Sequence, residues 1–299
     1  MDICGEKIKI RGRVLRIARL DADMFQFLEH TADQIEAGLK DLRAKADIFT
    51  FNQRLPNTTP IYPYSMEWEN FAALQISTFE EWWTKQIGFK ARNKAKQAEK
   101  KGVVLCEVPF SDELVEGIWA IYNETPVRQG RRFPHFGKSL EKVHVESATY
   151  PESSVFVGAY LDGKLIGFTR IVSDKTGTQA GLMNIVSLVS QRDKAPTNAL
   201  VAAAVKACAE RKVQFLTYSR FAYGKKQSDS LSDFKERNAF KRVEVPRYYI
   251  PLSPLGKFAM RYGLHHSLSE RMPEAIASRL RELRKAWYKR KYTTAYDVS

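Results

Sequence analysis

The sequence predicts a mixed α/β (α+β) fold in which a central mixed sheet is flanked by helices. Short apolar segments alternate with amphipathic helical patterns between residues 103 and 252. A nearly continuous apolar run at 182–189 is typical of a strand that is buried on both faces. A polar loop at 190–198 then opens a helical segment rich in Ala, Val and Leu.

The first elements of this region are one strand and two helices. Residues 103–110 are short and apolar and are bounded by Gly102 and Pro109, which predicts a strand. Residues 112–122 begin with two acids and repeat apolar residues at helical spacing, which predicts a helix. A second helix is expected at 139–149.

The remaining elements of the region begin with a hairpin. Two alternating segments, 155–160 and 165–172, flank Asp162 and Gly163, which is a hairpin signal because the tight turn needs positive φ. Pro196 stands where a helix tolerates proline best, in its first turn. The last expected elements are a helix at 199–211, a strand at 213–218, a short helix at 230–237 and a strand at 243–250.

This order of elements resembles the GNAT acyltransferase superfamily. The loop from Arg192 to Thr197 fits the superfamily's carrier loop loosely, without its glycines, and 234–240 is similar to a late aromatic stretch with Ala239 at the glycine position. The resemblance implies that central strands splay apart and that an acyl carrier sets its pyrophosphate on the loop's amides, where a helix N-terminus favours anions. The carrier-binding residues that it implies are Leu188, Gln191, Arg192, Lys194, Ala195, Thr197 and Asn198.

A second resemblance lies directly upstream of the first strand. The basic stretch 91–103 looks like the helix that precedes the catalytic half of Fem-type peptidyltransferases, which are duplicated GNAT folds that use aminoacyl-tRNA. This resemblance implies aminoacyl-tRNA as an alternative donor. It is also consistent with a degenerate first copy of the fold in the N-terminal part of the chain.

Four parts of the chain are expected from these patterns. They are a strand-rich subdomain at 1–76, a basic helix and connector at 77–102, the GNAT-like domain at 103–252 and a basic helical tail at 253–299. The first part should contain strands at 6–20, 48–51 and 71–76, an amphipathic helix at 22–45 and a proline-marked connection at 55–64. A single helix is expected over 78–101.

Composition limits the class of protein. With 299 residues and 44% hydrophobic content, the chain can bury a full core and is expected to hold two subdomains. The three cysteines lie far apart and no metal-ligand spacing is present, so neither a disulfide framework nor a metal site is expected. No leader pattern and no apolar stretch of membrane-spanning length is visible. These observations favour a cytoplasmic protein without a transmembrane segment.

The net charge of +14 predicts attraction to polyanions. Basic residues concentrate at 85–101, where several share one helical side, and at 271–291, where they interleave with leucines and aromatic residues. One interpretation is a solvated helix face in each case. The other is contact with phosphates on tRNA, on a lipid-linked precursor or on an anionic membrane surface.

Candidate chemistry concentrates in the connection that follows the first helix of the GNAT-like order. Acyl transfer to an amine needs proton transfer and an acid for the leaving group, and Glu124 is the candidate proton acceptor. Alternatively, Glu124 only marks the end of this helix, which Pro126 stops. The candidate substrate-binding residues of this loop are Arg128, Gln129, Arg131, Arg132 and His135.

Two tyrosines are the remaining catalytic candidates. Tyr218 and Tyr223 flank a strand near which GNAT enzymes often keep a tyrosine acid, so the resemblance implies that role, and structural packing is the alternative. No Ser-His-Asp order, Gly-x-Ser-x-Gly motif or Walker loop is present. A hydrolase or nucleotidase is therefore not expected.

Two classes of function follow. The first is an N-acyltransferase that moves an acyl group from acyl-CoA to a small-molecule or peptide amine in a cleft between splayed strands, with aminoacyl-tRNA as the alternative donor. The second is a non-catalytic module whose basic helices hold nucleic acid or an anionic surface.

Overall fold

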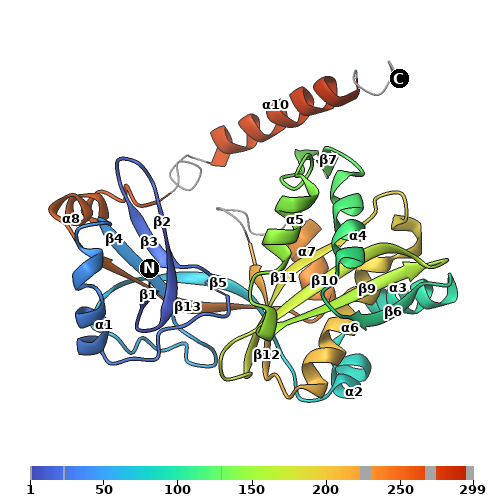
Figure 1. Cartoon of the computed structure of the whole chain (residues 1–299), viewed down its shortest axis with the longest axis horizontal. Coiled ribbons are helices and arrows are strands. Elements are labelled where there is room, and N and C mark those ends of the chain that lie inside the picture. The colour runs from blue at the N-terminus through green and yellow to red at the C-terminus, as the bar shows by residue number, and fades with distance from the viewer. Residues whose placement is uncertain (1, 23, 129, 223–229, 267–273, 294–299) are drawn as a thin grey trace. The chain divides into compact units, whose positions relative to one another are not determined.

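The computed structural model describes the chain except for residues 1, 23, 129, 223–229, 267–273 and 294–299 (Figure 1). The chain forms two compact units whose segments interleave in sequence. The first unit comprises Met1–Ser77, Ser173–Gly181 and Arg211–Glu270, and the second comprises Thr78–Val172, Leu182–Glu210 and Arg271–Ser299. Both combine a sheet with flanking helices, which confirms the predicted fold class.

The sheet of the first unit is mixed. Its strands lie in the order β1-β2-β3-β4-β13-β5-β12. They are β1 (Asp2–Ile3), β2 (Glu6–Arg11), β3 (Ile17–Leu20), β4 (Ile48–Asn52), β5 (Ser65–Gln75), β12 (Phe215–Arg220) and β13 (Lys241–Pro251). The last of these pairs antiparallel with both β4 and β5, whereas β3 and β4 are parallel. The helices of this unit are α1 (Ala32–Gly38), α7 (Ser230–Arg237) and α8 (Pro254–Arg261).

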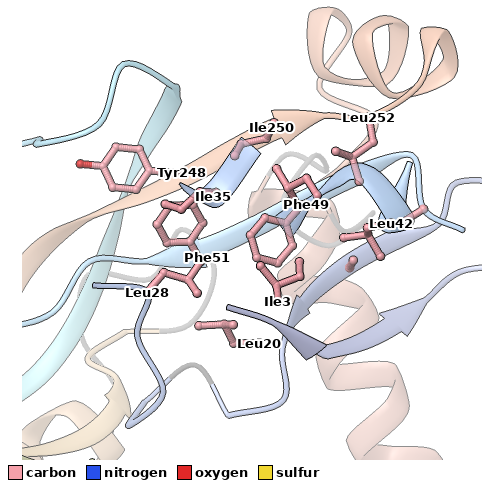
Figure 2. Close-up of a cluster of buried hydrophobic side chains, with 13 residues drawn as sticks. Ile3, Leu20, Leu28, Ile35, Leu42, Phe49, Phe51, Tyr248, Ile250 and Leu252 are labelled. Carbon is pink, nitrogen blue, oxygen red and sulfur yellow. The ribbon is translucent and has the colours of Figure 1, made fainter. Parts of the chain in front are cut away.

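One face of this sheet carries the apolar core of the first unit (Figure 2). Phe49 and Phe51 leave the same face of β4, because side chains alternate along a strand, and their rings stack with centroids 5.6 Å apart. Tyr248 from β13 packs against Phe51 at 5.2 Å. Ile35 of α1 is fully buried against the same cluster. Burial of these large side chains supplies the main driving force for folding this unit.

The second unit is a sheet with helices on both faces. Its antiparallel strands are β6 (Val104–Val108), β9 (Ser154–Leu161) and β10 (Lys164–Ser173), followed in the strand order by β11 (Gln179–Ser187). Its helices are α2 (Phe79–Glu81), α3 (Phe89–Lys100), α4 (Asp112–Asn123), α5 (Leu140–Ser147), α6 (Pro196–Glu210) and α10 (Glu274–Thr293). A short hairpin joins β7 (Val127–Arg128) to β8 (Arg131–Arg132).

Side chains alternate between the two faces of β9, so this strand contributes to both apolar cores of the second unit. Phe156 packs on the side of α4 and α5, whereas its neighbour Val157 packs on the side of α3 and α6 (Figure 1). In β10, Phe168 joins the first core and Ile166 joins the second, because an irregularity between Leu165 and Gly167 shifts the register.

Most sequence-predicted elements of the region 103–252 are confirmed within a few residues. The hairpin turn places Asp162 and Gly163 at φ values of 50° and 76°, the positive φ that the sequence predicts. Two boundaries differ most. Strand β11 begins at Gln179 rather than at 182, and α6 begins at Pro196 rather than at 199, because proline is itself the first helical residue.

Two helices predicted for the N-terminal part are wrong in extent. The helix expected at 22–45 is reduced to α1 and a 3₁₀ turn, because Thr31 and Gln34 form a capping box that fixes the helix start at Ala32. Phe25 and Leu28, which imitate helical spacing, are buried outside the helix.

The single helix expected at 78–101 is broken. Trp82–Gln86 winds as a π-helix, and Ile87 and Gly88 have extended backbone with ψ of 134° and 142° before α3 begins. Glycine has low helix propensity and here caps α3, which explains the break.

Phe51 provides a test of the first unit's core. Phe51→Ala should lower the free energy of unfolding by about 3–5 kcal/mol, because it removes a fully buried ring from a packed cluster. Urea unfolding monitored by circular dichroism measures this loss. The control Val14→Ala, at a side chain that is 84% exposed, should change stability by less than about 0.5 kcal/mol. Equal effects of the two substitutions would contradict the described packing.

Candidate functional site

Helix α4 delivers Glu124 to the start of the candidate carrier loop. The Ser111 side chain caps the helix by accepting the Leu114 amide, and the buried face packs Ile118 and Ile121 into the core. Glu124 is the C-cap residue and keeps helical backbone geometry. Because both helix ends are fixed in this way, the carboxylate has a defined position.

The Glu124 carboxylate binds the loop that follows β11. Oε2 accepts the Val189 amide at 2.6 Å, and Oε1 accepts both the amide and the hydroxyl of Ser190, at 2.9 and 2.8 Å. The Arg128 guanidinium donates to Oε2 at 3.3 Å. Four donors therefore converge on one carboxylate, which ties the end of α4 to the loop.

These contacts hold Glu124 in its ionised form. Burial alone would raise the pKa of Glu124, but the Ser190 and Val189 amides, the Ser190 hydroxyl and the Arg128 charge outweigh burial and lower the pKa below its ordinary value. A carboxylate with a lowered pKa and four donors is a weak proton acceptor. The geometry therefore favours an anchoring role, and the predicted role in proton transfer stays a prediction.

Arg128 joins three parts of the second unit. Its Nη1 donates to the Ser187 carbonyl at 2.6 Å, and its Nη2 donates to the Ile121 carbonyl at 2.8 Å. The guanidinium also lies 4.3 Å from the centre of the Phe133 ring. The side chain is largely buried, so its charge mainly organises the site.

Most backbone amides of the loop at 188–198 donate hydrogen bonds within the protein. Five of them donate to carbonyls three residues earlier, as in 3₁₀ turns; they belong to Gln191, Arg192, Lys194, Ala195 and Asn198. The amides of Val189 and Ser190 bind Glu124 instead. Ala195 takes the left-handed conformation at φ 54°, and the Thr197 hydroxyl lies 2.8 Å from that of Ser187. The loop thus satisfies much of its own hydrogen bonding.

Basic side chains surround this loop on its outer side. Arg192 is exposed and Lys194 is half-buried. The nearby Arg192 charge contributes to a lowered pKa for Arg128, after the larger effect of burial. Helix α3 contributes Lys101, whose Nζ donates to the Asp193 carbonyl at 2.9 Å and to its carboxylate at 3.2 Å. The site is therefore electropositive at the loop surface and could hold an anion through side chains.

His135 is placed close to these residues as a neutral imidazole. Its ring stacks on Tyr122 with centroids 4.2 Å apart, and its Nδ1 lies 3.0 Å from Lys138 Nζ. Burial first, and then the Lys138 charge, lower the pKa of His135 to about 4. With Nδ1 accepting from the ammonium, Nε2 carries the ring proton.

The other predicted site residues are distributed differently. Half-buried Leu188 packs against both cores of the second unit, and Arg131 and Arg132 are exposed on β8. Tyr218 lies in the first unit, where its ring contacts Phe240 at 5.8 Å and Lys235 Nζ at 4.9 Å. Gln129 and Tyr223 lie outside the described residues. The structure thus brings Glu124, Arg128 and the loop together.

Sequence reasoning missed the direct partners of Glu124 and the lysine that holds Asp193. The backbone amides of Val189 and Ser190 are 65 and 66 residues away from Glu124, and Lys101 is 92 residues from Asp193. Every residue except proline supplies a backbone N–H, so residue type gave no signal for the partners of Glu124. The charge pattern of α3 gave a weak signal for Lys101.

Helix α10 carries a separate exposed surface. Ile276, Leu280, Leu283 and Trp287 are each about half exposed or more and recur at positions i, i+4, i+7 and i+11, so they form one stripe. Its sequence holds seven basic residues and two acids. Lys291 Nζ lies 4.9 Å from the Trp287 ring. We call Ile276, Leu280, Leu283 and Trp287 the apolar stripe.

Among the described residues, every helix is too short or too polar to cross a bilayer. The apolar stripe covers one side of a helix whose sequence is otherwise rich in basic residues, which is the pattern of a helix that lies on a surface.

No family model and no curated protein matches the sequence. Solved structures do match its fold. FemX has a TM-score of 0.59 at 9% identity, covering 85% of this chain and 86% of that one. L-PGS from Bacillus licheniformis has a TM-score of 0.55 at 12% identity, covering 89% and 86%. The C-terminal DUF2156 domain of a putative lysylphosphatidylglycerol synthetase from Agrobacterium fabrum has a TM-score of 0.53 at 16% identity, covering 86% and 84%. The chain therefore shares its fold with FemX and with these two proteins over more than four fifths of its length.

The Glu124 anchor predicts how stability depends on pH. Glu124→Gln should lower the free energy of unfolding at pH 7 by about 1–3 kcal/mol, because an amide offers one acceptor oxygen and leaves a loop donor unpaired. The folded-state pKa is lowered, so this stabilisation is present above the unfolded pKa of about 4.3 and is lost as pH falls through the folded value. Urea titrations of both proteins from pH 7 to pH 3 measure the difference. A difference that grows as pH falls would contradict the anchor.

Proposed function

We propose that the protein is an aminoacyltransferase that takes an aminoacyl group from aminoacyl-tRNA and passes it to a nucleophile at an anionic membrane surface. The observation that carries the proposal is that most backbone amides of the loop at 188–198 already donate hydrogen bonds within the protein. A carrier whose pyrophosphate must be held by those amides would have to break several hydrogen bonds on binding. Each broken and unreplaced bond costs about 1–3 kcal/mol.

The donor choice also draws on charge and fold. A tRNA is a polyanion that exposed basic side chains can hold without free loop amides, and Arg192 at the loop together with the basic face of α3 offers such side chains. FemX and two proteins described as L-PGS or a putative lysylphosphatidylglycerol synthetase share the fold over more than four fifths of this chain. An N-acyltransferase that uses acyl-CoA is the alternative, supported by the positive charge that Arg192 and Lys194 keep at the loop.

The proposed reaction is a transesterification or an aminolysis. A bond forms between the acceptor's oxygen or nitrogen and the carbonyl carbon of the aminoacyl ester, and the bond from that carbon to the tRNA ribose oxygen breaks. One proton passes overall from the acceptor to the ribose oxygen. In this scheme Glu124 is a positioning residue that holds the loop, and Arg128 and Arg192 supply positive charge.

The membrane surface is proposed from α10. Its apolar stripe can enter the interface between lipid head groups and acyl chains, while its surplus of basic residues meets anionic head groups. Tryptophan at one end of the stripe suits this boundary, because its ring is amphipathic. A helix that contacts tRNA alone would have no use for four exposed apolar side chains in one stripe.

A transfer assay tests the donor. The full chain should move radiolabel from a mixture of aminoacyl-tRNAs to an extractable lipid or to an amine, and it should give no transfer and no thermal shift with acetyl-CoA. Arg192→Glu should slow the transfer at least about tenfold, because it replaces attraction to phosphate by repulsion. Arg13→Glu makes the same charge change at an exposed turn of the first unit and should leave the rate within about twofold.

Each other outcome of this assay has a clear meaning. Transfer from acyl-CoA with none from aminoacyl-tRNA would replace the proposal by the acyl-CoA-dependent N-acyltransferase. Binding of tRNA without transfer from either donor would indicate the non-catalytic module.

Vesicle co-sedimentation tests the membrane surface. The protein should bind vesicles of phosphatidylglycerol far better than vesicles of phosphatidylcholine, with binding that weakens as salt rises. Leu283→Glu should weaken binding at least about tenfold, because a buried leucine contributes about 1.5–3 kcal/mol. Ala286→Glu adds the same charge three residues away, outside the apolar stripe, and should weaken binding less. Equal losses from both variants would assign the binding to charge alone and would contradict a role for the stripe.

A further inference from the structure

One carboxylate and two imidazoles converge in the first unit. Glu67 lies in β5, and His265 and His266 follow α8. The Nε2 atoms of both imidazoles lie 3.1 Å from Glu67 Oε1. The three potential ligand atoms all lie within 4.8 Å of one another.

The end of α8 explains how both histidines reach β5. Gly263 takes φ 64° directly after the C-cap residue Tyr262, and its amide donates to Met260. The Leu264 amide donates to the Ala259 carbonyl at 2.8 Å. These two hydrogen bonds form a Schellman motif, which ends the helix and turns the chain back on itself. The next two residues are the histidines, so a rigid turn presents them.

His265 is held in one orientation. Its side chain is 5% exposed, and its ring meets Tyr249 of β13 edge-on with centroids 4.9 Å apart. Its Nδ1 lies 3.5 Å from the Ala259 carbonyl, while its Nε2 faces Glu67. A neutral imidazole has one donor and one acceptor, so one of its nitrogens must point a lone pair at an oxygen. A cation between Nε2 and the carboxylate removes this conflict.

A metal ion meets the geometry better than a proton does. A proton on His265 Nε2 would explain only the contact between His265 and Glu67. His266 Nε2 lies at the same distance from the same Glu67 oxygen. In a tetrahedral zinc site with bonds of about 2.0–2.1 Å, neighbouring ligand atoms are about 3.3 Å apart. Both N···O distances are close to that value. When Nδ1 of His265 donates to a carbonyl, its Nε2 lone pair is left for the metal, a common arrangement around metal-binding histidines.

The surrounding charges permit a cation. Arg220 and Arg247, from the adjoining strands, both bind the Glu69 carboxylate, at 2.7 and 3.4 Å, so their charges are partly balanced. Glu67 is then the anionic member of the cluster.

We propose that Glu67, His265 and His266 form a binding site for a divalent transition metal, most simply Zn²⁺. Two imidazoles and one carboxylate match the ligands of zinc and leave a fourth position for water, whereas Mg²⁺ and Ca²⁺ prefer oxygen ligands. The bound ion would fasten the chain that follows α8 to β5. Glu67 and His265 are 198 residues apart, so no spacing in the sequence indicates this site.

Metal analysis of the full chain, purified without a histidine tag and stripped with a chelator, tests the site. After dialysis against Zn²⁺, elemental analysis should find one ion per chain, and Mg²⁺ should not compete. Glu67→Gln and His266→Asn should each weaken Zn²⁺ affinity at least about tenfold in a chelator competition. The control His144→Asn removes another histidine that lies beside a carboxylate, 3.6 Å from Asp112, and should leave the affinity unchanged.

A second measurement needs no variant. The chain has five histidines, and Zn²⁺ titration followed by imidazole ¹⁵N resonances should shift two of them at one equivalent. A wild-type chain that takes up no Zn²⁺, variants that bind as tightly as wild type, or shifts in the other three histidines would overturn the proposal. Because the readout is binding alone, it is independent of the proposed transferase activity.

Discussion

The candidate site depends on one ionised carboxylate at the end of a helix. Glu124 accepts two backbone amides, one hydroxyl and one guanidinium, and each donor comes from a segment that must be fixed for the site to exist. The carboxylate can meet these donors because Ser111 and the buried face of α4 set the helix axis. Arg128 extends the same network to the end of β11 through the Ser187 carbonyl.

This arrangement has a consequence for donor chemistry. A loop that opens a long helix is an anion site when its amides point outward, because the helix dipole then acts on the ligand. Here Glu124 occupies two of those amides as an internal anion, and the chain's own carbonyls occupy five others. The positive charge available to a substrate comes from side chains such as Arg192. Such charge suits the spread phosphates of a nucleic acid better than a single tightly held pyrophosphate.

The sequence predicts those elements whose signals are local. The acids and apolar spacing of α4, the Asp162-Gly163 turn and the proline that opens α6 each act within a few residues. Prediction failed where local signals compete. Over 22–45 a capping box at Thr31 overrides an apolar pattern that looks helical, and over 78–101 Gly88 interrupts a strongly helical composition.

Contacts between distant residues could not be predicted in this way. The partners of Glu124 include amides that any residue would provide, and Glu67 meets two histidines almost two hundred residues later. Strand β13 is the last of the elements predicted for the region 103–252, yet it pairs with β4 and β5 of the N-terminal segment. Strand partners depend on the tertiary fold, and a strand's own alternation pattern does not specify them.

The measurement that tests this account most directly is hydrogen exchange of the Val189 and Ser190 amides, followed by NMR in the free protein and with acetyl-CoA. If Glu124 holds the loop as described, both amides exchange slowly in the free protein, acetyl-CoA changes nothing, and Glu124→Gln speeds their exchange. Rapid exchange in the free protein, followed by protection when acetyl-CoA is added, would show that these amides are free to bind the pyrophosphate of the carrier. That result would contradict the account.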